Sequence, residues 1–226
     1  MPSTGARRRC DLSLYLITDP ALTAARGLVE TVRAAVAGGV TLVQLRDKAA
    51  ADDELIRQAA ALRQALEGTG VPLIVNDRIA VARAAGAAGV HVGQNDAAAR
   101  IAREMLGPDA IVGLSAGSVA EARAVDPAIV DYVGIGPIFA TATKSDHRVP
   151  IGFDGFAAIR AAAPVPAVAI GGLRAEHADA AIRAGADGLA VISAICAAAD
   201  VTAAARHLAD AIAAARGQRP PPALPA

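Results

Sequence analysis

The sequence lacks several features that mark large classes of protein. It has only two cysteines, Cys10 and Cys196, in 226 residues, so it fits neither a disulfide framework nor a cysteine metal site. This usage favours a reducing, cytoplasmic environment, with Cys196 as a small buried apolar residue. The segment 1–10 is basic, but the short apolar run after it contains Asp19, so we expect neither a signal peptide nor a membrane span.

Net charge is absent as well. The 22 basic residues balance 22 acidic ones, so no overall field points to nucleic acid or to an anionic membrane. Any anion site must be a local cluster. The spacing of residues builds no catalytic triad, and no P-loop or G-x-G-x-x-G turn follows a strand. Nucleophilic and nicotinamide chemistry are therefore not expected, and His91 is interpreted as a hydrogen-bonded core or rim residue.

What the sequence does have is a regular alternation of short apolar runs and alanine-rich segments. The runs are rich in β-branched residues and predict strands at 12–18, 40–46, 72–76, 89–94, 110–115, 130–136, 166–172 and 188–193. Alanine-rich segments of helical period include 27–39, 52–68, 78–87, 118–125, 155–163, 176–186 and 201–217. Several of these end at glycine, as helices often do.

This alternation predicts the fold class, α/β. Strands that alternate with helices are parallel and joined by crossovers, and eight such units in this length favour a closed single-domain (β/α)₈ TIM barrel. An open doubly wound sheet is the alternative. We place the barrel at residues 11–216, because no linker or change of composition interrupts that span. Residues 1–10 and the proline-rich 217–226 are predicted to be disordered tails.

Function is expected where barrel strands end, and the end of the second predicted strand is basic. Side chains alternate along a strand, so Gln44, Arg46 and, if the strand continues, Lys48 share the face toward the barrel axis. Val43 and Leu45 then face the helices. Two cations at a barrel mouth are costly without a counter-anion, and the planar fork of arginine suits phosphate oxygens. The alternative is a solvated loop.

Two carboxylates follow the next two predicted strands. Neighbouring strands lie about 5 Å apart, so Asp77 and Asp96 can approach each other at the rim, where they would repel. A divalent cation removes this repulsion, and Mg²⁺ takes one or two carboxylates together with waters and phosphate oxygens. The sequence therefore suggests Mg²⁺ with a diphosphate.

The stretch YVGIGPIFATATKSDH, residues 132–147, adds hydroxyl and ammonium donors straight after a strand, at Thr141, Thr143 and Lys144. The turn at Gly171 and Gly172 allows backbone N–H groups to approach a second phosphate. Taken singly, each polar residue at a strand end has a structural explanation, for example as a helix N-cap or a turn residue. Taken together at one end of a barrel, they indicate two anion sites.

These residues also carry a resemblance. The motifs VQLRDK, LIVNDRIAVA, GVHVGQND, VGLS, YVGIGPIFATATK, AIGGL and GADGLAVIS occur in this order along nearly the whole chain. In order and spacing they resemble the thiamine-phosphate synthase family, also called thiamine-phosphate pyrophosphorylases. Enzymes of that family join an aminopyrimidine methyl diphosphate to a thiazole phosphate and release pyrophosphate.

The resemblance implies roles for individual residues. The pyrimidine diphosphate would be bound by Gln44, Leu45, Arg46, Asp47, Lys48, Asn76, Ser115 and Lys144, of which Arg46, Lys48, Ser115 and Lys144 would also serve catalysis. The thiazole phosphate would be bound by Thr141, Ala142, Thr143, Gly172, Ile192 and Ser193. One Mg²⁺ per active site would be held by Asp77 and Asp96. The family often has proline where this chain has Ala140, which is expected to loosen the loop without removing a ligand.

The mechanism implied by the resemblance is dissociative. The bond to pyrophosphate breaks first, and the thiazole nitrogen attacks the resulting pyrimidine-methyl cation, so no protein nucleophile is needed. The alternatives are a related barrel that isomerises the thiazole carboxylate phosphate and a non-catalytic phosphate-binding barrel. The sequence leaves open whether the chain forms a homo-oligomer, and whether the thiazole phosphate or its carboxylated form is preferred.

Overall fold

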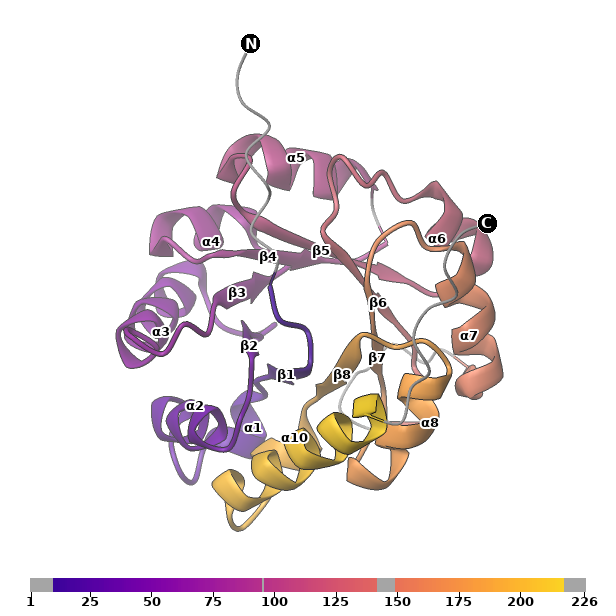
Figure 1. The fold of residues 1–226 in the computed structure, drawn as a ribbon. Coiled ribbons are helices and arrows are strands. Elements are labelled where there is room, and N and C mark those ends of the chain that lie inside the picture. The colour runs from indigo at the N-terminus through magenta and orange to yellow at the C-terminus, as the bar shows by residue number, and fades with distance from the viewer. Residues whose placement is uncertain (1–9, 95, 142–148, 218–226) are drawn as a thin grey trace.

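The eight predicted strands close into a barrel (Figure 1). The computed structural model describes residues 10–94, 96–141 and 149–217, with Asp96 described by its backbone. Each strand pairs in parallel with its neighbours in chain order, and β1 pairs with β8. The strands are β1 Leu14–Ile17, β2 Leu42–Leu45, β3 Leu73–Asn76, β4 Gly89–Val92, β5 Ile111–Ala116, β6 Tyr132–Ile135, β7 Ala167–Ile170 and β8 Gly188–Val191. The closed barrel is confirmed, and the open sheet is wrong.

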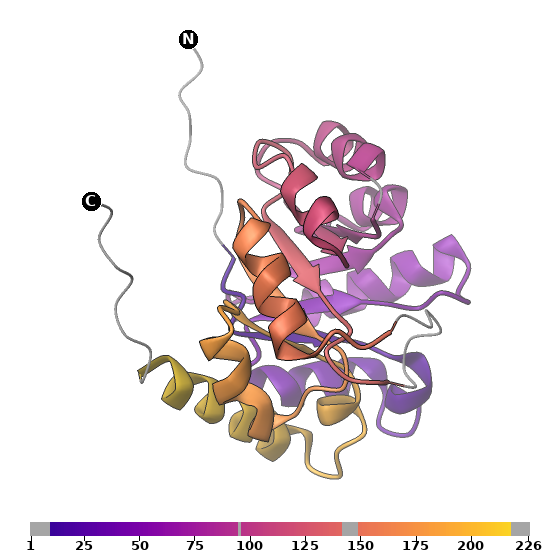
Figure 2. The same ribbon diagram turned by 90° about the vertical axis from the view of Figure 1, so that its right-hand side faces the viewer.

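Helices surround this barrel, and α10 lies beside α8 and α2 (Figures 1 and 2). They are α1 Pro20–Thr23, α2 Leu28–Ala37, α3 Asp52–Ala65, α4 Ile79–Ala85, α5 Asp96–Leu106, α6 Val119–Ala124, α7 Gly152–Ala162, η1 Ala175–His177, α8 Ala178–Arg183, α9 Ser193–Cys196 and α10 Val201–Gly217. All the helical segments that the sequence indicated are present. The short α1 and α9 follow β1 and β8 directly and add turns that four-residue patterns are too short to predict.

The strands separate two hydrophobic cores. Outward side chains, such as Val43 and Leu45 on β2, pack with the helices. Inward side chains, such as Leu42 on β2 and Ile74 on β3, fill the barrel interior. This alternation is the one expected for β2, since successive side chains of a strand point to opposite faces. It places Gln44, two residues after Leu42, inside the barrel, where it is 1 % exposed.

Charged side chains secure the amino-terminal end of the barrel. Asp131, just before β6, accepts hydrogen bonds from Arg103 Nη2 and from the Val112 backbone N–H, both at 2.7 Å. Asp187, just before β8, repeats this arrangement with Arg160 and the backbone N–H of Ala167. Each carboxylate therefore ties a helix to two neighbouring strands, on the face of the barrel that stabilises the fold.

We predict that Asp131→Ala lowers the free energy of unfolding by about 2–4 kcal/mol, because it leaves the nearly buried guanidinium of Arg103 without its counter-charge and the Val112 N–H without its acceptor. Asp179→Ala is the control: its partner Arg183 is 71 % exposed, and such a pair contributes about 0.3–0.5 kcal/mol. Urea denaturation measures both. Equal losses for the two variants would contradict the role given to Asp131.

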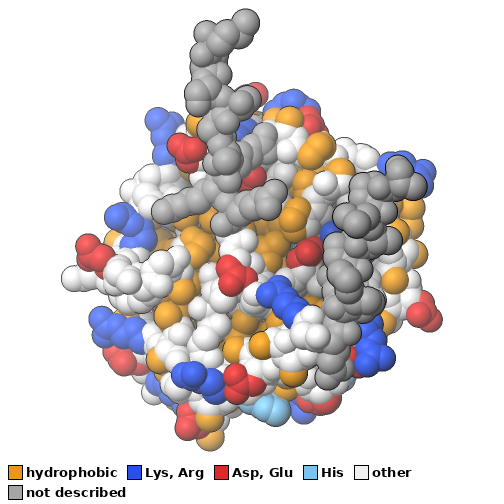
Figure 3. Space-filling model, viewed as in Figure 1, with side chains coloured by type: hydrophobic (Ala, Val, Ile, Leu, Met, Phe, Trp, Pro, Cys, Tyr) orange, Lys and Arg blue, Asp and Glu red, His pale blue; other side chains and the backbone are white. Residues whose placement is uncertain are grey.

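Acidic and basic side chains are interspersed over the face seen in Figure 3. Cys196 is buried as expected, and burial raises the pKa of its thiol to about 11. None of the described helices is long and apolar enough to cross a bilayer.

Candidate active site

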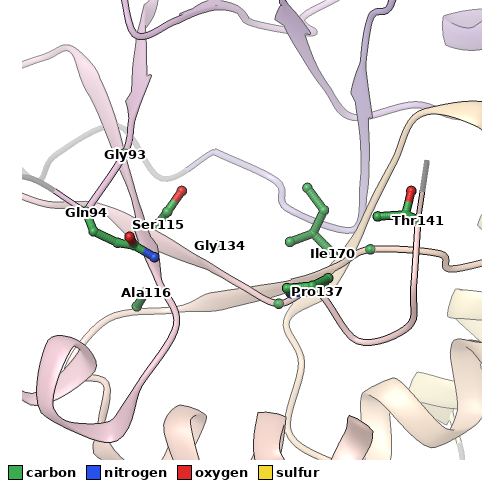
Figure 4. A pocket seen from close by; sticks show the side chains of 10 residues that line it. Gly93, Gln94, Ser115, Ala116, Gly134, Pro137, Thr141 and Ile170 are labelled. Atoms are coloured by element: carbon green, nitrogen blue, oxygen red, sulfur yellow. The ribbon is translucent and has the colours of Figure 1, made fainter. Parts of the chain in front are cut away.

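A cavity of about 380 Å³ opens at the carboxyl ends of the strands. Gln94 and Ser115 lie on one side of it, and Ile170, Pro137 and Thr141 lie on the other (Figure 4). Its lining residues come from β4 to β7 and the loops that follow them: Gly93, Gln94, Ser115, Ala116, Gly134, Gly136, Pro137, Thr141, Ile170 and Gly171. Strand ends thus form the cavity, as expected for a barrel enzyme.

A second, smaller hollow adjoins this cavity and shares Thr141, Ile170 and Gly171 with it. It brings together the described members of the set expected to bind the thiazole phosphate, namely Thr141, Gly172, Ile192 and Ser193. These residues come from the loop after β6 and the ends of β7 and β8. The structure therefore places them side by side, although they are up to 52 positions apart in the sequence.

Arg46 follows β2 directly and is 8 % exposed. Its backbone N–H donates to Thr18 Oγ1 at 3.0 Å, which ties the end of β2 to the end of β1. Among the residues that the structure describes, its guanidinium has no ion-pair partner. A nearly buried cation without a counter-charge is costly, so this position favours an anionic ligand.

The expectation that Lys48 continues the inward face of β2 is wrong. The strand ends at Leu45, and Lys48 lies exposed in a bend. Asp47 causes this bend, because its Oδ1 accepts from the backbone N–H groups of Ala49 and Ala50 at 2.9 and 3.0 Å. The Leu45 side chain faces the helices, so only the backbone of Leu45 can belong to the site.

Arg78 holds the loop that carries Lys48, a role that the sequence did not suggest. Its Nη1 donates to the Ala50 carbonyl at 2.6 Å and to Asp52 Oδ1 at 2.8 Å, and its Nη2 donates to the Lys48 carbonyl at 3.2 Å. The guanidinium therefore fixes the loop after β2 against the end of β3. Arg78 directly follows the predicted site residue Asp77 in the NDR motif, and this position is the sequence feature that could have indicated a role for Arg78 near the site.

Asn76 is the last residue of β3, and Asp77 follows it at the same rim. Asp77 is the one non-glycine among the described residues with a positive φ, 59°, a conformation that Asp and Asn tolerate best. Its backbone N–H donates to the His91 carbonyl at 2.8 Å, and its Oδ2 accepts from Asn76 Nδ2 at 2.7 Å. The carboxylate is thus oriented at the mouth by its neighbour.

This donor set suits a hard cation such as Mg²⁺, which prefers carboxylate oxygen. Within the described part of the chain, no cluster of three or more His, Cys, Asp or Glu side chains could hold a metal. Mg²⁺ can bind through only one or two protein carboxylates, because waters and phosphate oxygens complete its coordination shell. The second predicted ligand, Asp96, begins α5, and its side chain lies outside the described residues.

Comparison with known proteins agrees with the resemblance. Residues 14–195 match the family model of thiamine monophosphate synthase. The chain belongs to this family. It is 59% identical over 198 residues to thiamine-phosphate synthase of Azorhizobium caulinodans, covering 88% of this chain and 93% of that protein. It is 54% identical to the Xanthobacter autotrophicus synthase, covering 91% of this chain and 98% of that one.

A solved structure supports the same assignment. Thiamine phosphate pyrophosphorylase from Pyrococcus furiosus is 36% identical, with a TM-score of 0.81, and the match covers 92% of this chain and 98% of that one. A 3-hexulose-6-phosphate synthase structure, at 19% identity and a TM-score of 0.64, shares the fold. As a member of the thiamine monophosphate synthase family, the chain is an enzyme, a transferase. The alternative of a non-catalytic phosphate-binding barrel is therefore wrong.

Three residues predicted for this synthase site, Ala142, Thr143 and Lys144, lie outside the described residues, and their roles stay predictions. Ala140, the position where the family often has proline, is exposed just before that segment.

The sequence also missed a buried polar network beneath the synthase site. Gln44 Nε2 donates to the Tyr15 hydroxyl. The Tyr15 and Tyr132 hydroxyls lie 2.9 Å apart, Tyr132 Oη lies 2.9 Å from His91 Nδ1, and His91 Nε2 lies 3.1 Å from Ser115 Oγ. Burial raises the pKa of both tyrosines well above the usual value, so both stay protonated. His91 is hydrogen-bonded, as expected, and it contacts a predicted site residue.

We predict that Gly172→Ala is more destabilising than Gly68→Ala. Both glycines have left-handed φ, 67° and 77°, and a side chain there costs about 1–2 kcal/mol. A Cβ at Gly172 would also lie 2.9 Å from Phe139 Cβ, whereas nothing lies within 4 Å of one at Gly68. Denaturant titration of both variants measures the difference. Equal destabilisation would show that Phe139 and the loop after β6 shift to accommodate the added methyl group without a cost in free energy.

Proposed function

We propose that this enzyme makes thiamine phosphate in a Mg²⁺-dependent reaction. The 4-amino-2-methylpyrimidin-5-ylmethyl group would pass from its diphosphate to the nitrogen of a thiazole phosphate or its carboxylated form. The C–O bond to the diphosphate breaks and the C–N bond forms, so pyrophosphate leaves with the electron pair of the broken bond. Family membership supports the overall reaction.

The observation that carries the proposal is the position of Arg46. Arg46 follows the end of β2, is 8 % exposed and has no ion-pair partner among the described residues, a combination that suits an anionic substrate. The cavity of about 380 Å³ has the size of a small-molecule site, and the smaller hollow adjoins it beside Thr141, Gly172 and Ser193. One substrate would lie toward Ser115, and the phosphate of the other would lie by Thr141, Gly172 and Ser193.

In the proposed mechanism the protein stabilises charge and positions the rings. Arg46 would bind the diphosphate oxygens, on which negative charge grows as the bond breaks. Lys48, which is exposed in its bend, and Lys144 are proposed to bind the same group. The apolar wall around Ile170 would keep water from the reacting carbon. No nucleophile is required, which agrees with the absence of a triad from the sequence.

Asp77 and Asp96 would hold Mg²⁺. When bound, the ion neutralises part of the diphosphate charge and so assists its departure. The hydrogen bond from Asn76 to Asp77 Oδ2 orients the carboxylate and leaves Oδ1 for the cation. Charge neutralisation by these groups together is expected to supply most of the rate enhancement.

The direct test is to incubate the protein with the pyrimidine diphosphate, a thiazole phosphate and Mg²⁺, and to assay for thiamine phosphate and pyrophosphate. Formation of both in equal amounts supports the proposal. Isomerisation of the thiazole carboxylate phosphate without thiamine phosphate would support the alternative, a tautomerase-like member of the family. The same assay with each form of the thiazole identifies the preferred substrate.

We predict that Arg46→Met lowers kcat/KM about a hundredfold or more, the order seen when one charge-stabilising donor is removed. Because the guanidinium has no partner within the described chain, we expect no loss of unfolding free energy. Arg57→Met is the control, since Arg57 is 67 % exposed and pairs with Glu54 on α3. A variant that keeps its activity but loses stability would assign Arg46 a structural role instead.

We predict that Asp77→Asn raises the Mg²⁺ concentration for half-maximal activity about tenfold or more. Asparagine tolerates the left-handed backbone, so the change removes charge without adding strain. Activity is measured over a Mg²⁺ titration, and circular dichroism checks the fold. An unchanged Mg²⁺ dependence would remove Asp77 from the proposed metal site.

A further inference from the structure

A continuous row of hydrogen bonds crosses the barrel interior from β2 to β5. It consists of Gln44, Tyr15, Tyr132, His91 and Ser115, which we call the interior relay. The two tyrosines are no more than 1 % exposed and His91 is 9 % exposed. Ser115, at the other end, lines the cavity, and Figure 4 shows its hydroxyl directed toward the space between the two sides.

The fold makes room for the interior relay with glycines. In the sheet register, Gly113 on β5 lies between His91 on β4 and Tyr132 on β6. A Cβ at Gly113 would lie 2.3 Å from Tyr132 Cζ and 2.5 Å from His91 Nδ1. A Cβ at Gly134 would lie 3.2 Å from His91 Cε1. Small residues thus occur where the two rings need space to meet.

The donors and acceptors of the interior relay follow one direction. Each tyrosine hydroxyl carries a single proton. Gln44 Nε2 donates to Tyr15. If Tyr132 also donated to Tyr15, the Tyr15 proton would have no acceptor within the relay, so the Tyr15 proton is assigned to Tyr132 and the Tyr132 proton to His91 Nδ1. His91 must then accept at Nδ1 and carry its own proton on Nε2, which faces Ser115 Oγ at 3.1 Å. Ser115 accepts this proton, and its own hydroxyl proton is left for the cavity.

We propose that the interior relay holds His91 as the neutral Nε2–H tautomer, and that His91 is a positioning residue that makes Ser115 a hydrogen-bond donor to the substrate. The benefit to catalysis rests on the proposed function, because an anionic diphosphate needs a donor. Were the row reversed, Ser115 would donate to His91 and present lone pairs to an anion. The Gln44 amide, at the other end of the relay, therefore determines whether Ser115 presents its proton or its lone pairs to the cavity.

The tautomer can be observed directly by ¹⁵N NMR of the protein labelled at histidine, with His91→Asn used to assign the resonances. We expect a protonated Nε2 and an unprotonated Nδ1. Tyr132→Phe removes the Tyr132 donor to Nδ1, so the signals should move toward a mixture of tautomers. Tyr15→Phe cuts the link from Gln44 to Tyr132, so the Tyr132 hydroxyl can either donate to Nδ1 or accept from it, and this variant should also show a mixture of tautomers. The signals of the exposed His207 are the internal control and should not change in either variant. A proton on Nδ1 in the unmodified protein would overturn the proposal.

The kinetic test is a double-mutant cycle between Tyr132 and Ser115. Loss of one hydrogen bond of this kind corresponds to about threefold to tenfold, so Tyr132→Phe should lower kcat/KM by that factor. In a Ser115→Ala background the same change should cost less than about twofold, because the group it orients is gone. Equal losses in both backgrounds would show that Tyr132 supports only the fold, and would overturn the proposal.

If Tyr132→Phe does not fold, Tyr15→Phe serves as the second variant. The His91 tautomer in Tyr15→Phe, and the coupling between Tyr15→Phe and Ser115→Ala, then decide the proposal. In Tyr15→Phe a mixture of tautomers and a smaller coupling to Ser115→Ala are expected, while an unchanged Nε2–H form with no coupling would contradict the relay. Failure of the unmodified protein to form thiamine phosphate would reject the proposed function, whereas the NMR result would still test the tautomer separately.

Discussion

The parallel pairing of β1 with β8 is the constraint on which the rest of the structure depends. It places Tyr15 opposite Ala190 and closes the sheet, so that all carboxyl ends of the strands meet at one mouth. Residues more than 100 positions apart in the chain, such as Arg46 and Ser193, then belong to one rim. In an open sheet with the same strands, β1 and β8 would be edges, and these groups would be spread along a line.

Closure also divides the barrel into ends with different tasks. At the amino-terminal end, Asp131 and Asp187 each join a helix arginine to two strands, and their charges are satisfied within the protein. At the carboxyl end, Arg46 is nearly buried with no ion-pair partner in the described part of the chain. Charges with partners stabilise the fold, and a charge without one favours a ligand.

The barrel interior is less uniformly apolar than the cores of such barrels, which branched aliphatic side chains dominate. Its middle is occupied by Tyr15, Tyr132 and His91, which Gly113 and Gly134 accommodate. A buried polar row of this kind is favourable only when its members are hydrogen-bonded. Because it ends at Ser115, a change deep in the barrel can alter the chemistry of the mouth.

The sequence by itself determined the alternation of strands and helices, the inward position of Gln44, the approximate ends of the strands and the family. These depend on local periodicity and on contiguous motifs, which are read without knowledge of distant contacts. Only the tertiary structure decided that β2 stops before Lys48, that Arg78 holds the Lys48 loop, and that His91 connects Tyr132 to Ser115. Hydrogen bonds between residues on different strands depend on register and side-chain packing across the barrel, and no periodicity along one strand specifies them.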